Sequence, residues 1–331
     1  MRTNPEIAPV FHADARAVVY EGDCLKLLAS IPAGSIQLII TSPPYNIGKV
    51  YEQRSPLELY LESQRRVITE CVRVLKPQGS ICWQVGNFVD KKGLGSIVPL
   101  DTVLYPIFEK LGLKLRNRII WHFEHGLHCS NRFSGRYETI LWFTKTDDYV
   151  FNLDPVRVPQ KYPGKKYFKG PKTGQYSCNP LGKNPGDLWM IPNVKNNHVE
   201  KTGHPCQFPV ELVERFVLSM TEHDDWVLDP FAGVGTTMAA AVKHGRRGVG
   251  AELVASYNAM ARERVTAALN GDLKVRPMNT PIYDPQKAGS SLRIAPWLKP
   301  LVNNGPVYSE PSGKQFVLLE KGARLKTRAV S

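Results

Sequence analysis

The chain has 331 residues, with 43 Lys and Arg against 30 Asp and Glu, so its formal net charge at pH 7 is +13. With 42% hydrophobic and 22% charged residues the composition is globular, which excludes a disordered or collagen-like chain. No apolar run approaches the roughly 18 to 20 residues of a membrane span, and the N-terminal segment lacks a signal-peptide pattern. We therefore expect neither membrane insertion nor export, and the basic charge favours a polyanionic partner.

The first half of the chain predicts alternating strands and helices. Residues 19–42 indicate strand, helix and strand, because apolar residues at helical spacing separate two short apolar runs. A second helix is predicted to start at Pro56, with Ser55 as its N-cap, and to end before the stop signal at 76–79. Further strands are predicted over 80–85, 115–123 and 139–144. This alternation predicts a layered α/β domain.

The second half begins with a change of character. Over residues 152–204 Pro, Gly, Lys and Asn are dense and no periodicity persists, which predicts a loop-rich insertion. Regular structure resumes with a helix opened by Pro209 and a strand over 226–228. A Gly-rich turn, an Ala-rich helix and a strand over 248–253 follow, and after about residue 270 the chain is again rich in turn residues.

The Gly-rich turn, Asp-Pro-Phe-Ala-Gly-Val-Gly-Thr-Thr over 229–237, lies between a predicted strand and a predicted helix. There its backbone can approach a ligand at the carboxyl edge of a parallel sheet. Glu252 ends the next strand, where a carboxylate can accept hydrogen bonds from two ribose hydroxyls. A lone Gly-x-Gly is as well explained by a tight turn, but Asp229 and Glu252 favour a nucleoside cofactor. Met238, in place of a third glycine, disfavours a dinucleotide.

A second motif, Thr-Ser-Pro-Pro-Tyr over 41–45, also follows a predicted strand. Its two prolines remove two N–H donors, which leaves carbonyl groups and the Ser42 hydroxyl as acceptors beside the Tyr45 ring. Acceptors beside a ring suit a planar base that carries an exocyclic amino group. Alone, the motif would more often be a rigid turn with a surface tyrosine. Together with the Gly-rich turn it predicts a base pocket.

The two motifs together resemble those of the S-adenosylmethionine-dependent DNA amino-methyltransferases, which methylate N4 of cytosine or N6 of adenine. Their order is similar to that of the circularly permuted β class, in which the target-recognition region lies between them. The resemblance covers about 17–268 and implies an α/β, Rossmann-like class I methyltransferase fold with a mostly parallel twisted sheet. It implies a catalytic and cofactor-binding domain at 1–151 and 205–270, a target-recognition insertion at 152–204 and a C-terminal extension at 271–331.

The resemblance also implies the site residues. It places Ser42, Pro43, Pro44 and Tyr45 in the catalytic loop. It implies S-adenosylmethionine as the cofactor, bound by a larger set: Asp23, Thr41, His204, Pro205, Phe208, Asp229, Phe231, Gly233, Gly235, Thr236 and Glu252. Within this set Glu252 matches the ribose-binding acid, Asp23 approaches the adenine of the cofactor, and the segment 204–209 closes over its methionine part.

The same loop carries the expected mechanism. Acceptors at Ser42 and at the Pro43 carbonyl would hold the amino protons of a flipped base and aim the nitrogen lone pair at the sulfonium methyl, while Tyr45 stacks on the base. Family members with Asp at the position of Ser42 usually act on adenine, and those with Ser usually act on cytosine. Ser42 therefore favours N4 of cytosine, with N6 of adenine as the alternative. RNA or protein amide methylation and an inactive DNA-binding relative are more distant alternatives.

Cysteine and histidine patterns suggest competing chemistry. Pro-Cys-Gln at 205–207 imitates the nucleophile motif of cytosine-C5 methyltransferases, but here it precedes the cofactor loop and no Glu-Asn-Val follows, so we interpret Cys206 as an inert thiol. The six cysteines form no C-x-x-C pair and the eight histidines no H-x-x-x-H or H-E-x-x-H pair. We therefore expect a reducing cytoplasm and no metal requirement.

The positive charge is concentrated outside the two motif-bearing stretches. Those stretches together are nearly neutral, whereas the insertion at 152–204 holds nine basic and three acidic residues. Its lysines are the candidates for DNA phosphate contact: Lys161, Lys165, Lys166, Lys169, Lys172 and Lys183.

The resemblance names double-stranded DNA as the substrate, methylated at a specific site within a restriction-modification system or by an orphan methylase. A cognate restriction endonuclease and a second copy in a homodimer are candidate partners. The expected location is the bacterial or phage-infected cytoplasm, at the nucleoid.

Overall fold

The structure is a computed structural model, and it describes residues 6–46, 54–89, 96–126, 128–195 and 197–282. The chain divides into one compact unit, Met1–Thr280, and a second unit, Pro281–Ser331. Most of the second unit, and with it most of the expected C-terminal extension, lies outside the described residues. No helix among the described residues is long and apolar enough to cross a membrane.

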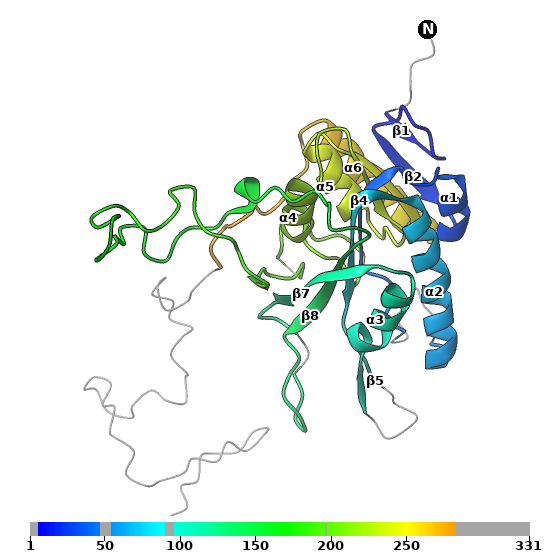
Figure 1. The fold of residues 1–331 in the computed structure, drawn as a ribbon. Coiled ribbons are helices and arrows are strands. Elements are labelled where there is room, and N and C mark those ends of the chain that lie inside the picture. The colour runs from blue at the N-terminus through cyan, green and yellow to red at the C-terminus, as the bar shows by residue number, and fades with distance from the viewer. Residues whose placement is uncertain (1–5, 47–53, 90–95, 127, 196, 283–331) are drawn as a thin grey trace, which may run out of the picture. The chain divides into compact units, whose positions relative to one another are not determined.

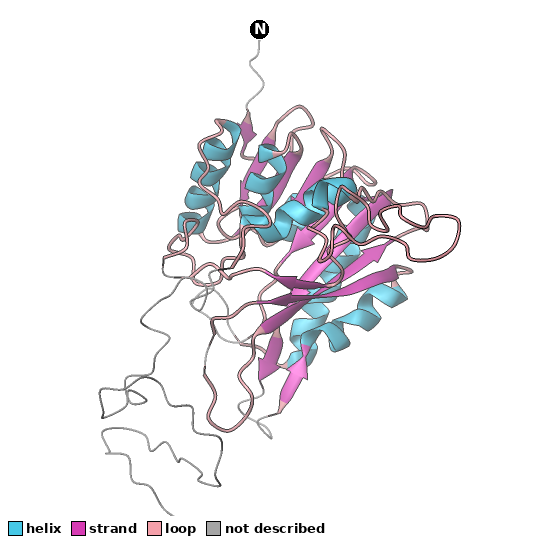
Figure 2. Cartoon of the chain, turned by 90° about the vertical axis from the view of Figure 1, so that its left-hand side faces the viewer, coloured by secondary structure: helices cyan, strands magenta, loops and turns pink. Residues whose placement is uncertain are grey.

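A single mixed sheet forms the centre of the first unit (Figures 1 and 2). Among the described residues it has nine strands in the order β1 (Ile7–Ala8), β2 (Ala17–Glu21), β11 (Arg247–Glu252), β10 (Trp226–Asp229), β3 (Ile36–Thr41), β4 (Leu75–Val85), β8 (Tyr137–Thr144), β7 (Lys114–His122) and β9 (Leu188–Met190). All neighbours pair in parallel except β8, which is antiparallel to both β4 and β7. The mostly parallel α/β fold predicted from the sequence is confirmed.

Helices cover both faces of the sheet. One face carries α1 (Cys24–Ser30), α2 (Leu57–Val74) and α3 (Leu100–Lys110), and the other carries α4 (Val210–Met220), α5 (Thr236–Lys243) and α6 (Ala255–Leu269). The strands alternate accordingly: Ile81 and Trp83 of β4 pack among α1 to α3, whereas Cys82 between them packs with the α4 cluster. Because both faces are covered, the central strands are mostly apolar, and their few buried polar residues include Gln37, Thr41 and Gln84.

Several boundaries differ from those predicted. Pro56 is itself the N-cap of α2, and Ser55, predicted as the cap, instead donates its backbone N–H to Asn46 Oδ1 at 2.7 Å. Strand β4 starts at Leu75, directly after α2, rather than at residue 80.

Four further elements carry no clear signal in the sequence. Helix α3 contains Pro106, and the apolar residues of α6 are spread around its circumference, so neither gives a clear helical pattern. Within the described ranges, the short strands β5 (Asn87–Val89) and β6 (Ile97–Pro99) pair only with each other. Such short strands carry too few residues for a recognisable alternation.

The insertion at 152–204 has little regular structure, as predicted. Its described residues contain the 3-10 turn η1 (Asp154–Val156), strand β9, and two isolated bridges that join Val158 to Lys183 and Lys166 to Tyr176. The insertion extends well beyond the sheet in Figure 1, where it is green.

The connections define where a ligand can bind. From β10 the chain runs through α5 to β11 on one side, and from β3 it runs through α2 to β4 on the other. Strands β10 and β3 are neighbours, so the sheet has its topological switch point between them. Ligands of open α/β sheets bind outside the carboxyl ends of the strands at such a point. Thr41, Asp229 and Glu252 are the last residues of β3, β10 and β11.

Candidate active site

The two predicted motifs meet where β3 and β10 end side by side. Thr41 Oγ1 donates a hydrogen bond of 2.6 Å to Asp229 Oδ1, and Thr237 Oγ1 donates one of 2.8 Å to Asp229 Oδ2. The N–H of Phe231 donates to Oδ1 at 3.1 Å. Asp229 is fully buried, and this burial raises its pKa to about 6. Its carboxyl group therefore fixes the Gly-rich turn against the start of the predicted catalytic loop.

The Gly-rich turn depends on two left-handed glycines. Gly233 has φ 53° and Gly235 has φ 73°, and Gly235 is the N-cap of α5. A Cβ on Gly235 would lie 2.9 Å from the Cβ of Ala261, so only glycine lets the turn approach α6 this closely. The turn thereby brings the N-terminus of α5, the positive end of its dipole, to the carboxyl edge of the sheet.

Arg264 of α6 holds this turn through hydrogen bonds. Its Nη1 donates to the carbonyl of Val234 at 2.7 Å and to Thr236 Oγ1 at 2.9 Å. Burial lowers the pKa of Arg264 to about 10. Thr236, predicted to bind the cofactor, is itself buried and bonded to this guanidinium. Phe231 is half-buried and meets the ring of Trp83 edge-on, with 6.2 Å between centroids.

Glu252 lies beside the same turn. Its Oε2 accepts the N–H of Gly233 at 2.9 Å and its Oε1 accepts the N–H of Val254 at 2.8 Å. Burial raises the pKa of Glu252. Each oxygen keeps a second lone pair, so the carboxylate can still accept two hydroxyl groups. The ribose-binding role of Glu252 stays a prediction, and these lone pairs leave room for it.

Asp23 lies on the neighbouring strand end. Glu21 of β2 is in register with Glu252, and the N–H of Gly22 donates to the carbonyl of Glu252 at 2.9 Å. The next residue, Asp23, is exposed and caps α1, with its Oδ1 accepting the N–H of Leu25 at 2.8 Å. Asp23 thus stands next to the Glu252 end of the site and already has a structural role there.

The segment 204–209 lies on the other side of the Gly-rich turn. His204 is buried, its ring meets that of Tyr257 edge-on, and its Nδ1 accepts the N–H of Cys206 at 3.2 Å. Burial lowers the pKa of His204 to about 4, so the ring is neutral at pH 7. A Cβ on Gly233 would lie 3.6 Å from His204 Nε2, which places the ring against the turn. In the same segment Pro205 and Cys206 are exposed and Phe208 is half-buried.

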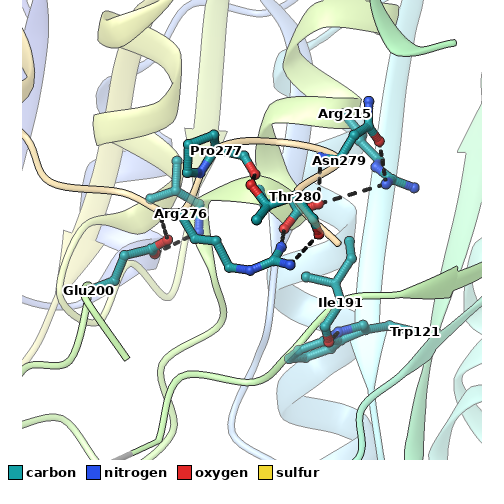
Figure 3. A network of polar contacts seen from close by, with 10 residues as sticks. Trp121, Ile191, Glu200, Arg215, Arg276, Pro277, Asn279 and Thr280 are labelled. Carbon is teal, nitrogen blue, oxygen red and sulfur yellow. Dashed lines mark hydrogen bonds and ion pairs between the residues drawn. The ribbon is translucent and has the colours of Figure 1, made fainter. Parts of the chain in front are cut away.

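A polar network holds this segment and the start of α4 in place (Figure 3). Glu200 accepts the N–H of Val210 at 2.8 Å and the N–H of Arg276 at 3.2 Å. The guanidinium of Arg276 pairs with Glu211, and Arg215 donates to Asn279 Oδ1 at 3.0 Å. Residues that follow α6 are therefore fastened to the face of α4, directly next to the predicted cofactor segment.

A chain of three polar side chains joins the predicted catalytic loop to β8. Ser42 Oγ lies 2.9 Å from the hydroxyl of Tyr45, and Tyr45 donates to Glu138 Oε2 at 3.1 Å. Gln84 Nε2 donates to the same carboxylate oxygen at 2.5 Å. Burial raises the pKa of both Tyr45 and Glu138. The prolines complete the loop: Pro43 is buried and Pro44 half-buried.

Glu138 and Gln84 are site residues that the sequence motifs do not predict. They lie on β8 and β4, which pair antiparallel, so the sheet brings both side chains to the catalytic loop. The only signal for them in the sequence is a polar residue within an otherwise apolar strand, and that signal by itself does not identify a partner.

The six lysines predicted to contact DNA are all exposed. The ammonium groups of Lys161 and Lys166 lie over the rings of Tyr162 and Tyr176, at 5.4 and 5.2 Å from the centroids. The lysines lie in the insertion, apart from the residues that meet at the strand ends. Their role in DNA binding and the roles of the cofactor residues stay predictions. Within the described part of the chain, no three His, Cys, Asp or Glu side chains are grouped to hold a metal ion.

Comparison with known proteins identifies the family. A family model described as DNA methylase, N6 and N4 type, matches residues 36–263. The type II methyltransferase M.BglII of Bacillus subtilis is 54% identical over 239 residues, which span 72% of this chain and 66%, just under two thirds, of that protein. M.ScaI of Streptomyces caespitosus, also a type II methyltransferase, is 36% identical over 78% of this chain and 84% of its own. The DNA adenine methyltransferase YhdJ of Escherichia coli K12 is 32% identical over 81% of this chain and 88% of its own.

Two solved structures resemble the fold. The cytosine-N4-specific PvuII DNA methyltransferase matches with a TM-score of 0.62 and 23% identity, over 82% of this chain and 96% of its own. TTHA0409 of Thermus thermophilus, described as a putative DNA modification methylase and solved with S-adenosyl-L-methionine, matches with a TM-score of 0.54 and 31% identity, over 78% and 98%. The family match covers most of the chain and both motifs, and so the chain belongs to the N6/N4 DNA methylase family and is a DNA methyltransferase.

Proposed function

We propose that this DNA methyltransferase transfers a methyl group to N4 of a cytosine flipped out of duplex DNA. The chain from Ser42 through Tyr45 to Glu138 carries methylation of an exocyclic amino group, and serine rather than aspartate at position 42 favours cytosine over adenine. The single hydroxyl hydrogen of Tyr45 is given to Glu138, so Ser42 must donate its own hydrogen to Tyr45. Both lone pairs of the Ser42 oxygen then stay available as acceptors.

These lone pairs suit an exocyclic amino group. The nitrogen lone pair of cytosine N4 is delocalised into the ring, which makes the amino group a poor nucleophile. An acceptor that holds one amino hydrogen favours a more pyramidal nitrogen and directs its lone pair toward the methyl donor. The rigid Pro43 and Pro44 backbone keeps this acceptor in place, because proline fixes φ.

The cofactor that we propose is S-adenosylmethionine, which supplies an electrophilic methyl group on a sulfonium. Glu252 would accept the ribose hydroxyls with its remaining lone pairs, and the Gly233 turn would let the backbone approach the cofactor. The neutral ring of His204 closes the site beside the turn without adding a positive charge next to the sulfonium. Supporting the proposal, a relative with 31% identity was solved with this molecule.

The DNA would be bound by the insertion at 152–204. Its six exposed lysines can neutralise phosphates, and exposed aromatic side chains lie between them. The insertion is joined to the catalytic strands, because β9 pairs in parallel with β7. The sheet therefore joins the lysine-bearing insertion to the strand that ends next to Ser42, and duplex DNA bound by the insertion would lie near that site.

Adenine N6 is the second candidate, since one relative at 32% identity is a DNA adenine methyltransferase. The test is to incubate DNA from a methylation-free host with the protein and with S-adenosylmethionine labelled in the methyl group, and then to identify the modified nucleoside by mass spectrometry. We expect labelled N4-methylcytosine, and its loss in Ser42→Ala. Label found only in N6-methyladenine would overturn the assignment of the base. Sequencing of the modified DNA then maps the target site.

A further inference from the structure

Phe133 is an apolar ring held almost entirely in solvent. It is 99% exposed, more than any other large apolar side chain among the described residues. It lies in the loop that connects β7 to β8, which extends as a long arm from the ends of these strands (Figure 1). A single exposed apolar side chain is common on protein surfaces, so the place of this ring in the fold decides whether it has a role.

The arm starts at the catalytic site. Glu138, five residues after Phe133, accepts hydrogen bonds from Tyr45 and Gln84. Five extended residues span at most about 17 Å. The ring of Phe133 is therefore tethered within reach of the pocket in which the target base would react, and it belongs to the same edge of the sheet.

Hydrogen bonds keep the arm in shape. The N–H of Phe123 donates to the carbonyl of Arg136 at 2.8 Å and closes its base. Nearer the tip, the N–H of Cys129 donates to Ser134 Oγ at 3.0 Å. Asn193 of the insertion donates to the carbonyl of His125 at 2.8 Å, which joins the arm to the segment proposed to hold DNA.

The charge of the arm fits a polyanion. Between Glu124 and Glu138 the sequence contains no acidic residue, whereas Arg132 directly precedes Phe133 and Arg136 follows three residues later. Arginines that flank an apolar ring can hold the two phosphates on either side of a step in DNA while the ring enters between the bases.

We propose that Phe133 enters the DNA stack and fills the space that the target base leaves when it is flipped out. This inference rests on the proposed function, in which the base leaves the duplex. Flipping removes the stacking of the neighbouring bases, and an aromatic ring in the gap restores part of it. Phe168, 84% exposed in the insertion, has no such tether to the catalytic loop and serves as the matched control.

The experiment compares Phe133→Ala with Phe168→Ala on two duplexes that carry the mapped target site. In one duplex the target base is paired normally, and in the other it stands opposite an abasic site, where less energy is needed to flip it. We expect Phe133→Ala to lower kcat/KM roughly tenfold to hundredfold on the paired duplex. On the duplex with the abasic site, its kcat/KM should be close to that of the parent protein. Phe168→Ala should change kcat/KM by the same factor on both duplexes.

A second measurement separates flipping from catalysis. With 2-aminopurine at the target position, binding of the parent protein should raise the fluorescence of the 2-aminopurine, and binding of Phe133→Ala should raise it much less. In the methylation assay, Phe133→Trp should methylate the paired duplex about as well as the parent protein does. An equal decrease in kcat/KM for Phe133→Ala on both duplexes, or no decrease on either, would overturn the proposal. An inactive parent protein would instead contradict the proposed function, so the two failures are distinguishable. Unchanged thermal unfolding and cofactor binding establish that the variant is folded.

Discussion

The hydroxyl of Thr41 donates a hydrogen bond of 2.6 Å to the carboxyl group of Asp229, 188 residues later in the chain. The bond joins the last residue of β3 to the last residue of β10, at the topological switch point of the sheet. Ser42 follows the first of these residues and the Gly-rich turn follows the second. One buried hydrogen bond thus sets the position of the proposed methyl acceptor site relative to the proposed cofactor site.

Thr41→Val should weaken the fold measurably. Valine keeps the shape of the side chain but removes the donor, so Asp229 loses a partner while it stays buried. We expect the free energy of unfolding to fall by about 1 to 3 kcal/mol, the usual contribution of one hydrogen bond to a carboxyl group, because Thr237 and the N–H of Phe231 remain as partners. Urea unfolding measures the change, and Thr41→Ser, which keeps the hydroxyl, is the control. A Thr41→Val protein as stable as the serine variant would contradict the role given to this bond.

The pH dependence of stability should report on Asp229 itself. Burial raises the pKa of Asp229 from 3.8 to about 6, so the folded state holds this proton more tightly than the unfolded state. Its contribution to stability is therefore complete below about pH 4 and is lost as the pH rises through about 6. In the Asp229→Asn variant the side chain at position 229 does not titrate.

The measurement is urea unfolding of both proteins across this pH range. The free energy of unfolding of the parent, relative to Asp229→Asn, should decrease by at most about 3 kcal/mol between about pH 4 and 7 and then stay constant. A difference that does not vary with pH, or one that grows as the pH rises, would show that the carboxyl group is not held in its protonated form by burial.

The parts of the site that depend on short-range signals could be predicted from the sequence. The Gly-rich turn and the Ser-Pro-Pro-Tyr loop each follow an apolar run that forms a buried strand, so their placement at strand ends could be predicted. Glu138 and Arg264 could not be predicted in the same way. Glu138 reaches Tyr45 only because β8 pairs antiparallel with β4, and Arg264 reaches Val234 only because α6 packs under the turn. Both contacts arise from tertiary packing, which local patterns do not encode.

Glu252→Gln should weaken cofactor binding without unfolding the protein. The amide keeps one acceptor oxygen, but its NH2 group would face the N–H of either Gly233 or Val254 and the negative charge is lost. Because hydrogen bonds to charged groups contribute about 1.5 to 3 kcal/mol, we expect the Kd for S-adenosylmethionine to rise roughly tenfold to hundredfold. Calorimetric titration measures it. Glu263→Gln, an exposed change on α6, is the control; the same Kd for both variants would exclude Glu252 from the ribose site.

Cys206→Ala should leave methylation unchanged. The thiol is exposed within the segment 204–209, and transfer to an exocyclic amino group requires no covalent intermediate with the protein. We expect kcat within about twofold of the parent, because the thiol forms no bond during the transfer. Complete loss of methyl transfer by a folded Cys206→Ala protein would instead support addition of a thiolate to the cytosine ring, and the product would then be 5-methylcytosine.

Removing lysines from the insertion should reduce the salt dependence of DNA binding. Each phosphate contact contributes about 0.9 to the slope of log K against log salt concentration, so Lys165→Ala with Lys169→Ala should lower the slope by up to about 1.8. Fluorescence anisotropy with a labelled duplex over a series of NaCl concentrations measures this slope. The matched control is Lys26→Ala with Lys110→Ala, two exposed lysines on α1 and α3 that change the net charge equally. If both pairs reduce the slope by the same amount, the effect is due to net charge alone and the insertion is not the surface that holds the phosphates.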